Sequence, residues 1–369
     1  MSKKICHIST AHYENDSRIL LKECQSLSKA GYDVSLIVNS DKDKYIYGTN
    51  IIALDNSKTS RMYRLLKKRK IALKKAIEVD AELYHFHDPE LIGIGKKLKK
   101  MGKKVIYDVH EDVPKQILSK TYLGPAPIRK IISNIFNFHE KHQSKKFDGV
   151  VGAIEEISNQ FPNKRATTIK NYAIKDLIDN AVPVERENND KLVVIYVGCI
   201  TRIRGIVELI KSVEVFNGEV ELWILGPWET EELRVECEAL GGYQYSKYFG
   251  SLPLAEVYKY VKSADIGICT LHPTQNYIES IPIKILEYMA CSMPIILSDF
   301  KYWKNLFGDV GIYVDPQEPI SISKAISTFM NNKELIKEKG NENREEFLKS
   351  FSWDAEEKKL LNLYEDILK

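Results

Sequence analysis

Hydrophobic and polar positions alternate between two periods along the chain. Short apolar runs rich in β-branched and aromatic residues predict buried strands at 3–10, 32–40 and 191–198. Between such runs lie amphipathic segments, as at 16–31, where apolar residues recur at helical spacing before a terminal glycine. The apolar positions of this helix are Ile19, Leu20, Cys24 and Leu27. Strands that alternate with helices predict an α/β protein with parallel sheets covered on both faces.

The alternation runs through two series, and a chain of 369 residues is long enough for two domains. A polar, acidic segment at 176–190 separates the two series and indicates a linker. The chain ends in an amphipathic helix. We therefore predict an N-terminal domain over 1–178, a second domain over 179–350 and a C-terminal helix over 351–369.

The net charge of +3 hides an asymmetry between the halves. Residues 1–180 contain 33 Lys and Arg against 21 Asp and Glu, whereas 181–369 contain 21 against 30. We expect the basic half to face an anionic partner. No apolar run approaches the roughly 18 residues needed to span a bilayer, and the six cysteines form no CxxC pair. These features are typical of a cytoplasmic protein with reduced cysteines.

Candidate chemistry is concentrated at 276–296, where Glu279 and Glu287 border the start of a predicted helix. Pro282 suits the first turn of that helix, and Ser280 is placed to cap it. Free backbone N–H groups at the helix start form an anion site suited to a diphosphate. We expect the N–H groups of Ile281, Ile283 and Lys284 to form this site. The two carboxylates can then bind hydroxyl groups on either side of the diphosphate.

This segment resembles the donor-binding signature of retaining glycosyltransferases of family 4, in which two glutamates are separated by seven residues. The resemblance extends to 196–210, which looks like the family's phosphate loop, and to 248–268, which looks like its base-binding loop and following strand. It implies a GT-B fold: two Rossmann-like, doubly wound domains that face a cleft, with a C-terminal helix that crosses back to the first domain.

The resemblance also implies roles for individual residues. Glu287 would bind the ribose of a nucleotide sugar, Glu279 the donor sugar, and Arg204 the diphosphate. Arg204 and Glu279 are thus catalytic candidates, together with His110, which would contact the donor sugar or its leaving phosphate. The full set of predicted donor-binding residues is Gly198, Arg202, Arg204, Gly226, Gly250, Leu252, Ser280, Ile281, Pro282, Ile283 and Glu287.

The chain departs from the family pattern at two places. Many members have an arginine directly after the glycine of the phosphate loop, where this chain has Cys199, and we expect Arg202 to substitute. The first loop, 10–19, contains none of the family's glycines. The candidates for contacts on the acceptor side are His12, Asp16, Arg18 and Asp108. Asp16 is equally well placed as a helix cap.

We expect no metal and no cofactor in the reaction, because no Asp-x-Asp motif occurs in a suitable position. His85, His87 and Asp88 could share a strand face and bind a metal, but a hydrogen-bonded cluster at a strand end is the favoured interpretation. The histidines of 139–142 are one residue too close for the zinc helix motif.

Basic stretches with interleaved apolar residues occur at 58–75, 95–104 and 124–146. They are typical of contact with anionic lipid, although a solvated basic face has the same composition. Nucleic acid is disfavoured, because no recognition motif accompanies the charge.

The resulting hypothesis is a retaining glycosyltransferase that moves a sugar from a nucleotide-diphosphate sugar, with UDP-sugar favoured, to a glycan or lipid-linked acceptor in cell-surface polysaccharide synthesis. It would be cytoplasmic, either free or peripheral on the inner face of the plasma membrane. Two alternatives remain open: a 2-epimerase-like enzyme of the same fold, and a non-catalytic, membrane-associated assembly partner.

Overall fold

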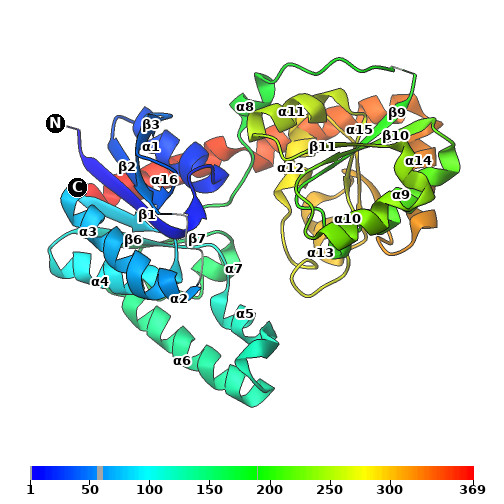
Figure 1. Ribbon diagram of the computed structural model, residues 1–369. Coiled ribbons are helices and arrows are strands. Elements are labelled where there is room, and N and C mark those ends of the chain that lie inside the picture. The colour runs from blue at the N-terminus through cyan, green and yellow to red at the C-terminus, as the bar shows by residue number, and fades with distance from the viewer. Residues whose placement is uncertain (1, 56–60, 189) are drawn as a thin grey trace. The chain divides into compact units, whose positions relative to one another are not determined.

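The computed structural model describes residues 2–55, 61–188 and 190–369 and divides into two compact units (Figure 1). The first unit comprises Met1–Asn171 together with Trp353–Lys369, and the second comprises Tyr172–Ser352. Both units are α/β, as the alternating pattern predicts. Of the three basic stretches, the first begins with Lys58, which lies outside the described residues.

The first unit is built on an eight-stranded sheet of order β3-β4-β2-β1-β5-β6-β7-β8. Its described pairs are parallel except for β3 with β4. The strands are β1 Lys4–Tyr13, β2 Asp33–Asn39, β3 Lys44–Ile46, β4 Thr49–Leu54, β5 Leu83–Phe86, β6 Lys104–Val109, β7 Gly149–Gly152 and β8 Ala166–Thr168. The central strand β1 is buried continuously from Ile5 to Thr10, so that His7, Ser9 and Thr10 are buried together with its apolar residues.

The helices of the first unit are α1 Gln25–Lys29, preceded without a break by the helical segment Ser17–Cys24, then α2 Arg61–Tyr63, α3 Arg69–Val79, α4 Ile92–Lys100, α5 Val113–Ser119, α6 Ala126–Ser144, α7 Glu155–Ser158 and α16 Trp353–Leu368. α16 is the last helix of the chain, and it packs on this unit. The indole Nε1 of Trp353 donates to the Ser26 hydroxyl at 3.0 Å. Tyr364 is fully buried in the same interface.

The second unit has a six-stranded sheet of order β11-β10-β9-β12-β13-β14, and all its described pairs are parallel. The strands are β9 Leu192–Val197, β10 Val220–Leu225, β11 Ser246–Gly250, β12 Ile266–Cys269, β13 Ile295–Ser298 and β14 Gly311–Val314. The helices are α8 Lys175–Asp179, α9 Ile206–Val213, α10 Glu231–Glu238, α11 Leu254–Ser263, α12 Ile283–Ala290, α13 Lys301–Phe307, α14 Pro319–Met330 and α15 Lys333–Glu346. Val193 and Ile195 enter one core layer, while Val194 and Tyr196 enter the other, so both faces of β9 are buried.

The part of the predicted linker that the structure describes before 189 packs on the second unit, and the boundary between the units lies earlier, at Asn171. Within the second unit, Arg186 makes two hydrogen bonds of 2.8 and 2.9 Å to Asp265, and Lys262 Nζ donates to the backbone oxygen of Ala181 at 2.8 Å. An acidic, polar composition was therefore compatible with a packed segment, because its charged groups find partners on the domain.

Candidate functional site

Three glycines stand at the carboxyl ends of neighbouring strands in the second unit. Gly198 follows β9 with φ 129°, and Gly226 follows β10 with φ 135°. A Cβ on Gly226 would lie 2.0 Å from the carbonyl oxygen of Gly198, so a side chain there is excluded. The Gly226 N–H donates to the Gly250 oxygen at 2.8 Å at the end of β11, and Leu252, two residues on, packs against the core. Backbone that carries no side chains therefore lies at the edge where α/β sheets bind ligands.

Arg204 lies at this edge because its loop is anchored from both ends. The next residue, Gly205, has φ 76°, and a Cβ there would lie 2.2 Å from the Thr270 oxygen. Arg204 Nε donates to the Tyr277 hydroxyl at 3.3 Å. Its terminal nitrogen Nη1 would lie 3.4 Å from a Cβ placed on Gly198. The guanidinium is thus held beside the glycine turn.

Lys284 is a second cation at the same turn, and sequence reasoning assigned no role to its side chain. Its Nζ would lie 3.4 Å from a Cβ on Gly198 and is 4.1 Å from the centre of the Tyr196 ring. The nitrogen is buried, with no hydrogen-bond partner in the described parts of the chain. Burial lowers the pKa of Lys284 to about 8. A buried ammonium without a partner is costly, so this position favours an anion.

A signal for Lys284 was present in the sequence. A lysine in the first turn of a helix opposes the helix dipole, which favours acids at that end. A cation placed there against the dipole indicates that negative charge comes from elsewhere. The fold then brings Lys284 next to Gly198, where Cys199 stands in place of the arginine that many family 4 members have.

The segment before α12 differs in detail from the prediction. α12 begins at Ile283, and Pro282 takes the cap position with extended backbone (φ −71°, ψ 120°) instead of lying in the first turn. Ser280 does not cap the helix: its hydroxyl donates to the Tyr277 oxygen at 3.1 Å. The indole Nε1 of Trp303 holds the Ser280 carbonyl at 2.8 Å. The N–H of Ile281 precedes the helix, so helix geometry leaves those of Ile283 and Lys284 at its start.

The two glutamates are held differently. Glu287 is half-buried in α12 and accepts a 2.7 Å hydrogen bond from the Tyr258 hydroxyl of α11. Burial, together with the charge of Glu287, raises the pKa of Tyr258 well above its usual value, so the tyrosine stays a donor. Glu279 is exposed in the preceding loop, at a shallow hollow also lined by Phe300 and Tyr302. The Glu287 carboxylate is thus preorganised, whereas the Glu279 carboxylate is open to solvent.

Arg202 does not reach this group. It is exposed and forms an ion pair with Glu236 of α10. The expected substitution of Arg202 for the missing family arginine is therefore wrong, because its side chain is engaged on the helix side of the loop. Lys284 occupies the position beside Gly198 instead.

In the first unit, the predicted residues meet at the carboxyl ends of β1 and β6. Arg18 is 4% exposed and Asp108 is fully buried. The Arg18 Nε and Nη2 atoms donate to the two oxygens of Asp108 at 3.2 and 3.1 Å. Burial would raise the pKa of Asp108, but the charge of Arg18 outweighs this and holds it well below its usual range. Arg18 and Asp108 are therefore not available to an acceptor, which corrects their predicted role: they position other groups.

The group that they position is His110, which is partly exposed. Its Nε2 lies 3.2 Å from Asp108 Oδ2, and its ring centre lies 5.1 Å from that of His12. His12 Nδ1 is 2.8 Å from Asp16 Oδ2. Asp16 also accepts from the backbone N–H groups of Arg18 and Ile19, at 2.9 and 3.0 Å, so the cap interpretation of Asp16 holds. The described edge thus presents two histidines whose orientation is fixed by acids, the fully buried Asp108 and the partly exposed Asp16.

Comparison with known sequence families indicates the enzyme class. Residues 178–346 match the family described as glycosyl transferases group 1.

The second unit is a glycosyltransferase domain.

It contains the glycine turn, Arg204, Lys284 and both glutamates. No curated protein sequence matches the chain significantly.

Solved structures of glycosyltransferases share the fold along the whole chain. Sucrose-phosphate synthase from Thermosynechococcus elongatus is 18% identical with a TM-score of 0.75, and the match covers 99% of each chain. A glycosyltransferase from Rickettsia africae is 15% identical with a TM-score of 0.69, covering 100% of this chain and 99% of that one. HepE from Anabaena, solved in complex with UDP-glucose, is 13% identical with a TM-score of 0.70, covering 98% and 99%. The expected fold class, with two Rossmann-like units, is confirmed.

Proposed function

We propose that this glycosyltransferase is a retaining enzyme of the family 4 type that uses a nucleotide-diphosphate sugar. The observation that carries the proposal is the pair of cations, Arg204 and Lys284, beside the open backbone of Gly198 and the start of α12. A diphosphate would supply the anion that the buried Lys284 nitrogen lacks. A UDP-sugar is the preferred candidate, because HepE was solved with UDP-glucose.

The proposed reaction needs charge stabilisation more than a protein nucleophile. The bond between the anomeric carbon and the diphosphate oxygen breaks, and the acceptor oxygen bonds to the same face of that carbon. The acceptor proton passes to the departing diphosphate. Arg204, Lys284 and the α12 N–H groups would stabilise the negative charge that develops on the leaving group, so we propose that no metal is required.

Around this centre, Glu287 is proposed to bind the ribose hydroxyls, since its bond to Tyr258 fixes one face of the carboxylate. Glu279 is proposed to bind the donor sugar. His110 is proposed to contact the donor sugar or its leaving phosphate, and His12 is proposed to serve the acceptor side. A carboxylate hydrogen bond to a sugar hydroxyl contributes roughly 1.5–3 kcal/mol, which is large enough for each role to be measured.

Calorimetry with UDP and GDP tests the proposal. We expect saturable binding of at least one nucleotide, weakened at least tenfold in Glu287→Ala and in Lys284→Met, and unchanged in Arg202→Ala. A donor screen by mass spectrometry, with glycan and lipid-linked acceptors, then identifies the transfer. Absence of binding, or equal binding in all variants, would count against a donor site here. Formation of an epimeric free sugar would indicate the 2-epimerase-like alternative.

The acceptor is proposed to be lipid-linked, in cell-surface polysaccharide synthesis, because α6 carries an unusual exposed face. Ile135 is 65% exposed and Phe138 is 75% exposed. In Figure 1, α5 and α6 form a hairpin that extends from the rest of their unit. Basic residues flank the apolar face at both ends of α6: Arg129, Lys130, Lys141, Lys145 and Lys146. Among the described helices, none combines the length and apolar character required to cross a bilayer.

We propose that this face binds the surface of an anionic membrane on its cytoplasmic side, each basic residue near the surface contributing about 1 kcal/mol. Flotation with phosphatidylserine vesicles should recover the wild type and lose Ile135→Asp. The matched control is Ile320→Asp in the second unit, because Ile320 is 66% exposed and lies outside α6. Equal flotation on neutral and anionic vesicles, or equal loss in both variants, would contradict the assignment. Flotation without any transfer activity would indicate a non-catalytic assembly partner.

A further inference from the structure

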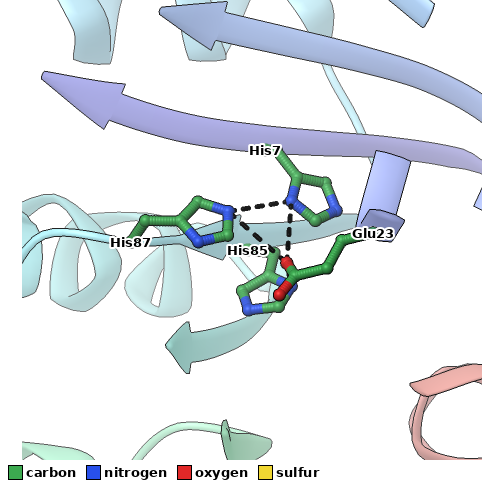
Figure 2. A group of neighbouring side chains, drawn as sticks. All are labelled: His7, Glu23, His85 and His87. Atoms are coloured by element: carbon green, nitrogen blue, oxygen red, sulfur yellow. Dashed lines mark hydrogen bonds and ion pairs between the residues drawn. The ribbon is translucent and has the colours of Figure 1, made fainter. Parts of the chain in front are cut away.

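A cluster of buried histidines in the first unit is not used by the proposed reaction. His7 lies in the middle of β1 and is paired in register with His85 of β5, and His87 follows that strand. The Glu23 side chain reaches the same point from the helical segment before α1. Figure 2 shows the four side chains converging. All four are buried, and one potential ligand atom from each lies within 4.8 Å of every other.

The distances within the cluster leave Glu23 outside its hydrogen bonds. His7 Nδ1 and His87 Nε2 are hydrogen-bonded to each other at 2.9 Å, and an ion would replace that bond. The Glu23 Oε2 atom is 3.8 Å from His7 Nδ1 and 3.9 Å from both His85 Nδ1 and His87 Nε2. These separations are too long for hydrogen bonds, and Oε2 has no hydrogen-bond partner among the described residues. Ligands about 2.0–2.1 Å from a tetrahedral zinc ion lie about 3.3 Å apart. Bringing Glu23 and the rings around an ion therefore shortens each of these three separations by about half an ångström.

The charges around the cluster also favour a cation. Arg18 faces two carboxylates: its Nε is 3.1 Å from Glu23 Oε1, and its Nη2 is 3.1 Å from Asp108 Oδ1. One guanidinium cannot neutralise both acids. Without an ion, burial and the charge of Asp108 raise the pKa of Glu23 well above its usual value, so the second carboxyl is held protonated. A divalent cation held by neutral imidazoles would take the place of that proton.

Two of the histidines have the outer partners that metal-bound histidines usually have. His87 Nδ1 lies 3.2 Å from Asp108 Oδ2, which leaves Nε2 to face the cluster. His7 Nε2 lies 3.0 Å from the Tyr364 hydroxyl, which leaves Nδ1 to face it. Such partners fix the orientation and the tautomer of a ligating ring. The Tyr364 hydroxyl also lies 2.7 Å from His85 Nδ1, and this second contact would give way to the ion.

We propose that His7, His85, His87 and Glu23 form a closed, four-coordinate site for a first-row divalent cation, with Zn²⁺ as the preferred ion. Three imidazoles and one carboxylate are a ligand set typical of zinc. The site has no open coordination position, and it lies inside the first unit, whereas Gly198 and Arg204 belong to the second. Its role is therefore structural: it ties β1, β5 and the Ser17–Cys24 helix together and, through Tyr364, holds α16.

Metal analysis of the purified full chain tests the proposal. Protein produced in zinc-supplemented medium and dialysed against a chelator should retain about one equivalent of zinc by mass spectrometry. Glu23→Gln and His85→Gln should lose it, and Tyr364→Phe should weaken zinc affinity about 10–100-fold. The matched control is His139→Gln/His142→Gln, which removes two exposed histidines of α6 and should leave the zinc content unchanged.

Cobalt provides a readout that does not depend on the stability of a variant. The wild type, refolded with Co²⁺ in place of zinc, should show the intense visible bands of a tetrahedral ion. Nucleotide binding by the second unit, followed in parallel, reports whether each protein is folded there. Less than a tenth of an equivalent of any divalent metal in the wild type, with weak octahedral cobalt bands, would overturn the proposal. Loss of zinc in the control variant would overturn it as well, since the metal would then be on the surface.

Discussion

The two units present chemically different groups at the carboxyl ends of their strands. At this edge of the first unit the predicted acceptor-side groups are already paired: Arg18 with Asp108, and His12 with Asp16. In the second unit the Lys284 nitrogen has no hydrogen-bond partner in the described structure. The same α/β architecture thus supports one edge whose charges are balanced internally and another that favours an added anion. Structural groups therefore differ from ligand-binding groups in whether their charges are already paired, and the number of charges does not distinguish them.

The strongest way to break this comparison is to remove a paired charge in the first unit. Asp108→Ala would leave the Arg18 guanidinium facing only Glu23 in a buried position. We expect a loss of about 3–5 kcal/mol in the free energy of unfolding of that unit, measured by urea denaturation with probes specific to each unit. The exposed Asp354→Ala should cost no more than about 0.5 kcal/mol. A loss of less than 1 kcal/mol for Asp108→Ala would mean that the pair is not structurally important.

In the second unit we expect the opposite pattern: lost activity with little lost stability. Arg204→Ala should lower kcat/KM about 10²–10³-fold, because it removes a donor aimed at charge that develops in the transition state. Arg202→Ala is the matched control. Its side chain, two residues earlier, is exposed and paired with Glu236, so its kcat/KM should stay within about twofold. If Arg202→Ala lowered kcat/KM more than Arg204→Ala, the phosphate contact would belong to Arg202, and the assignment to Arg204 would be wrong.

The alternation of apolar residues predicted most of the fold, because buried parallel strands leave a continuous apolar run such as Val193–Tyr196. Composition failed at 176–190, since charged residues of a packed segment look like those of a linker until their partners are known. The same limit applies to Arg202. Its position in the sequence places it in the predicted phosphate loop, but only the fold shows that its side chain turns toward Glu236 of α10.

For the sites, local motifs were informative and long-range contacts were not. Ser280 was expected to cap α12, but Pro282 takes the cap position, and the Ser280 hydroxyl bonds the Tyr277 carbonyl instead. The cluster that joins His7 and Glu23 to His85 depends on the register of β1 against β5, which a single sequence does not reveal. Positions that the fold brings together from distant strands therefore remained invisible until the structure was known.

The pH dependence of nucleotide binding can sharpen the assignment of Lys284. Burial lowers its pKa from 10.5 to about 8. A phosphate needs the charged form, so affinity for UDP should fall by up to about tenfold per pH unit above pH 8. Between pH 8 and 10.5 the unfolded chain keeps a proton that the folded one has released, so the stability of this unit should rise over that window.

Isothermal titration at pH 7, 8 and 9, corrected for buffer ionisation, measures the effect. Lys284→Arg keeps its charge throughout and should flatten the profile. An unchanged affinity up to pH 9 in the wild type would show that Lys284 does not contact the phosphate.

The smallest expected effect concerns a partly exposed pair at the first unit's edge, His12 and Asp16. Burial alone would lower the pKa of His12, but the hydrogen bond and charge of Asp16 raise it above 6.5. Burial would likewise raise the pKa of Asp16, but His12 lowers it well below 3.8. The stabilisation by Asp16 is thus lost as pH falls through its folded pKa, and that by His12 is lost as pH rises through its own. The pair should therefore stabilise the unit most between about pH 4 and 6.5.

Asp16→Asn tests this pair while leaving the helix cap in place, since asparagine caps as well as aspartate. We expect the variant to be about 0.5–1 kcal/mol less stable at pH 5.5, because each side chain is only a quarter to a third exposed, and the difference to shrink toward pH 8. Urea midpoints at the two pH values, together with NMR titration of the His12 ring, measure it. A difference that is equal at both pH values would mean that Asp16 acts only as a cap, and that even the exposed part of this edge is held by backbone hydrogen bonds instead of paired charge.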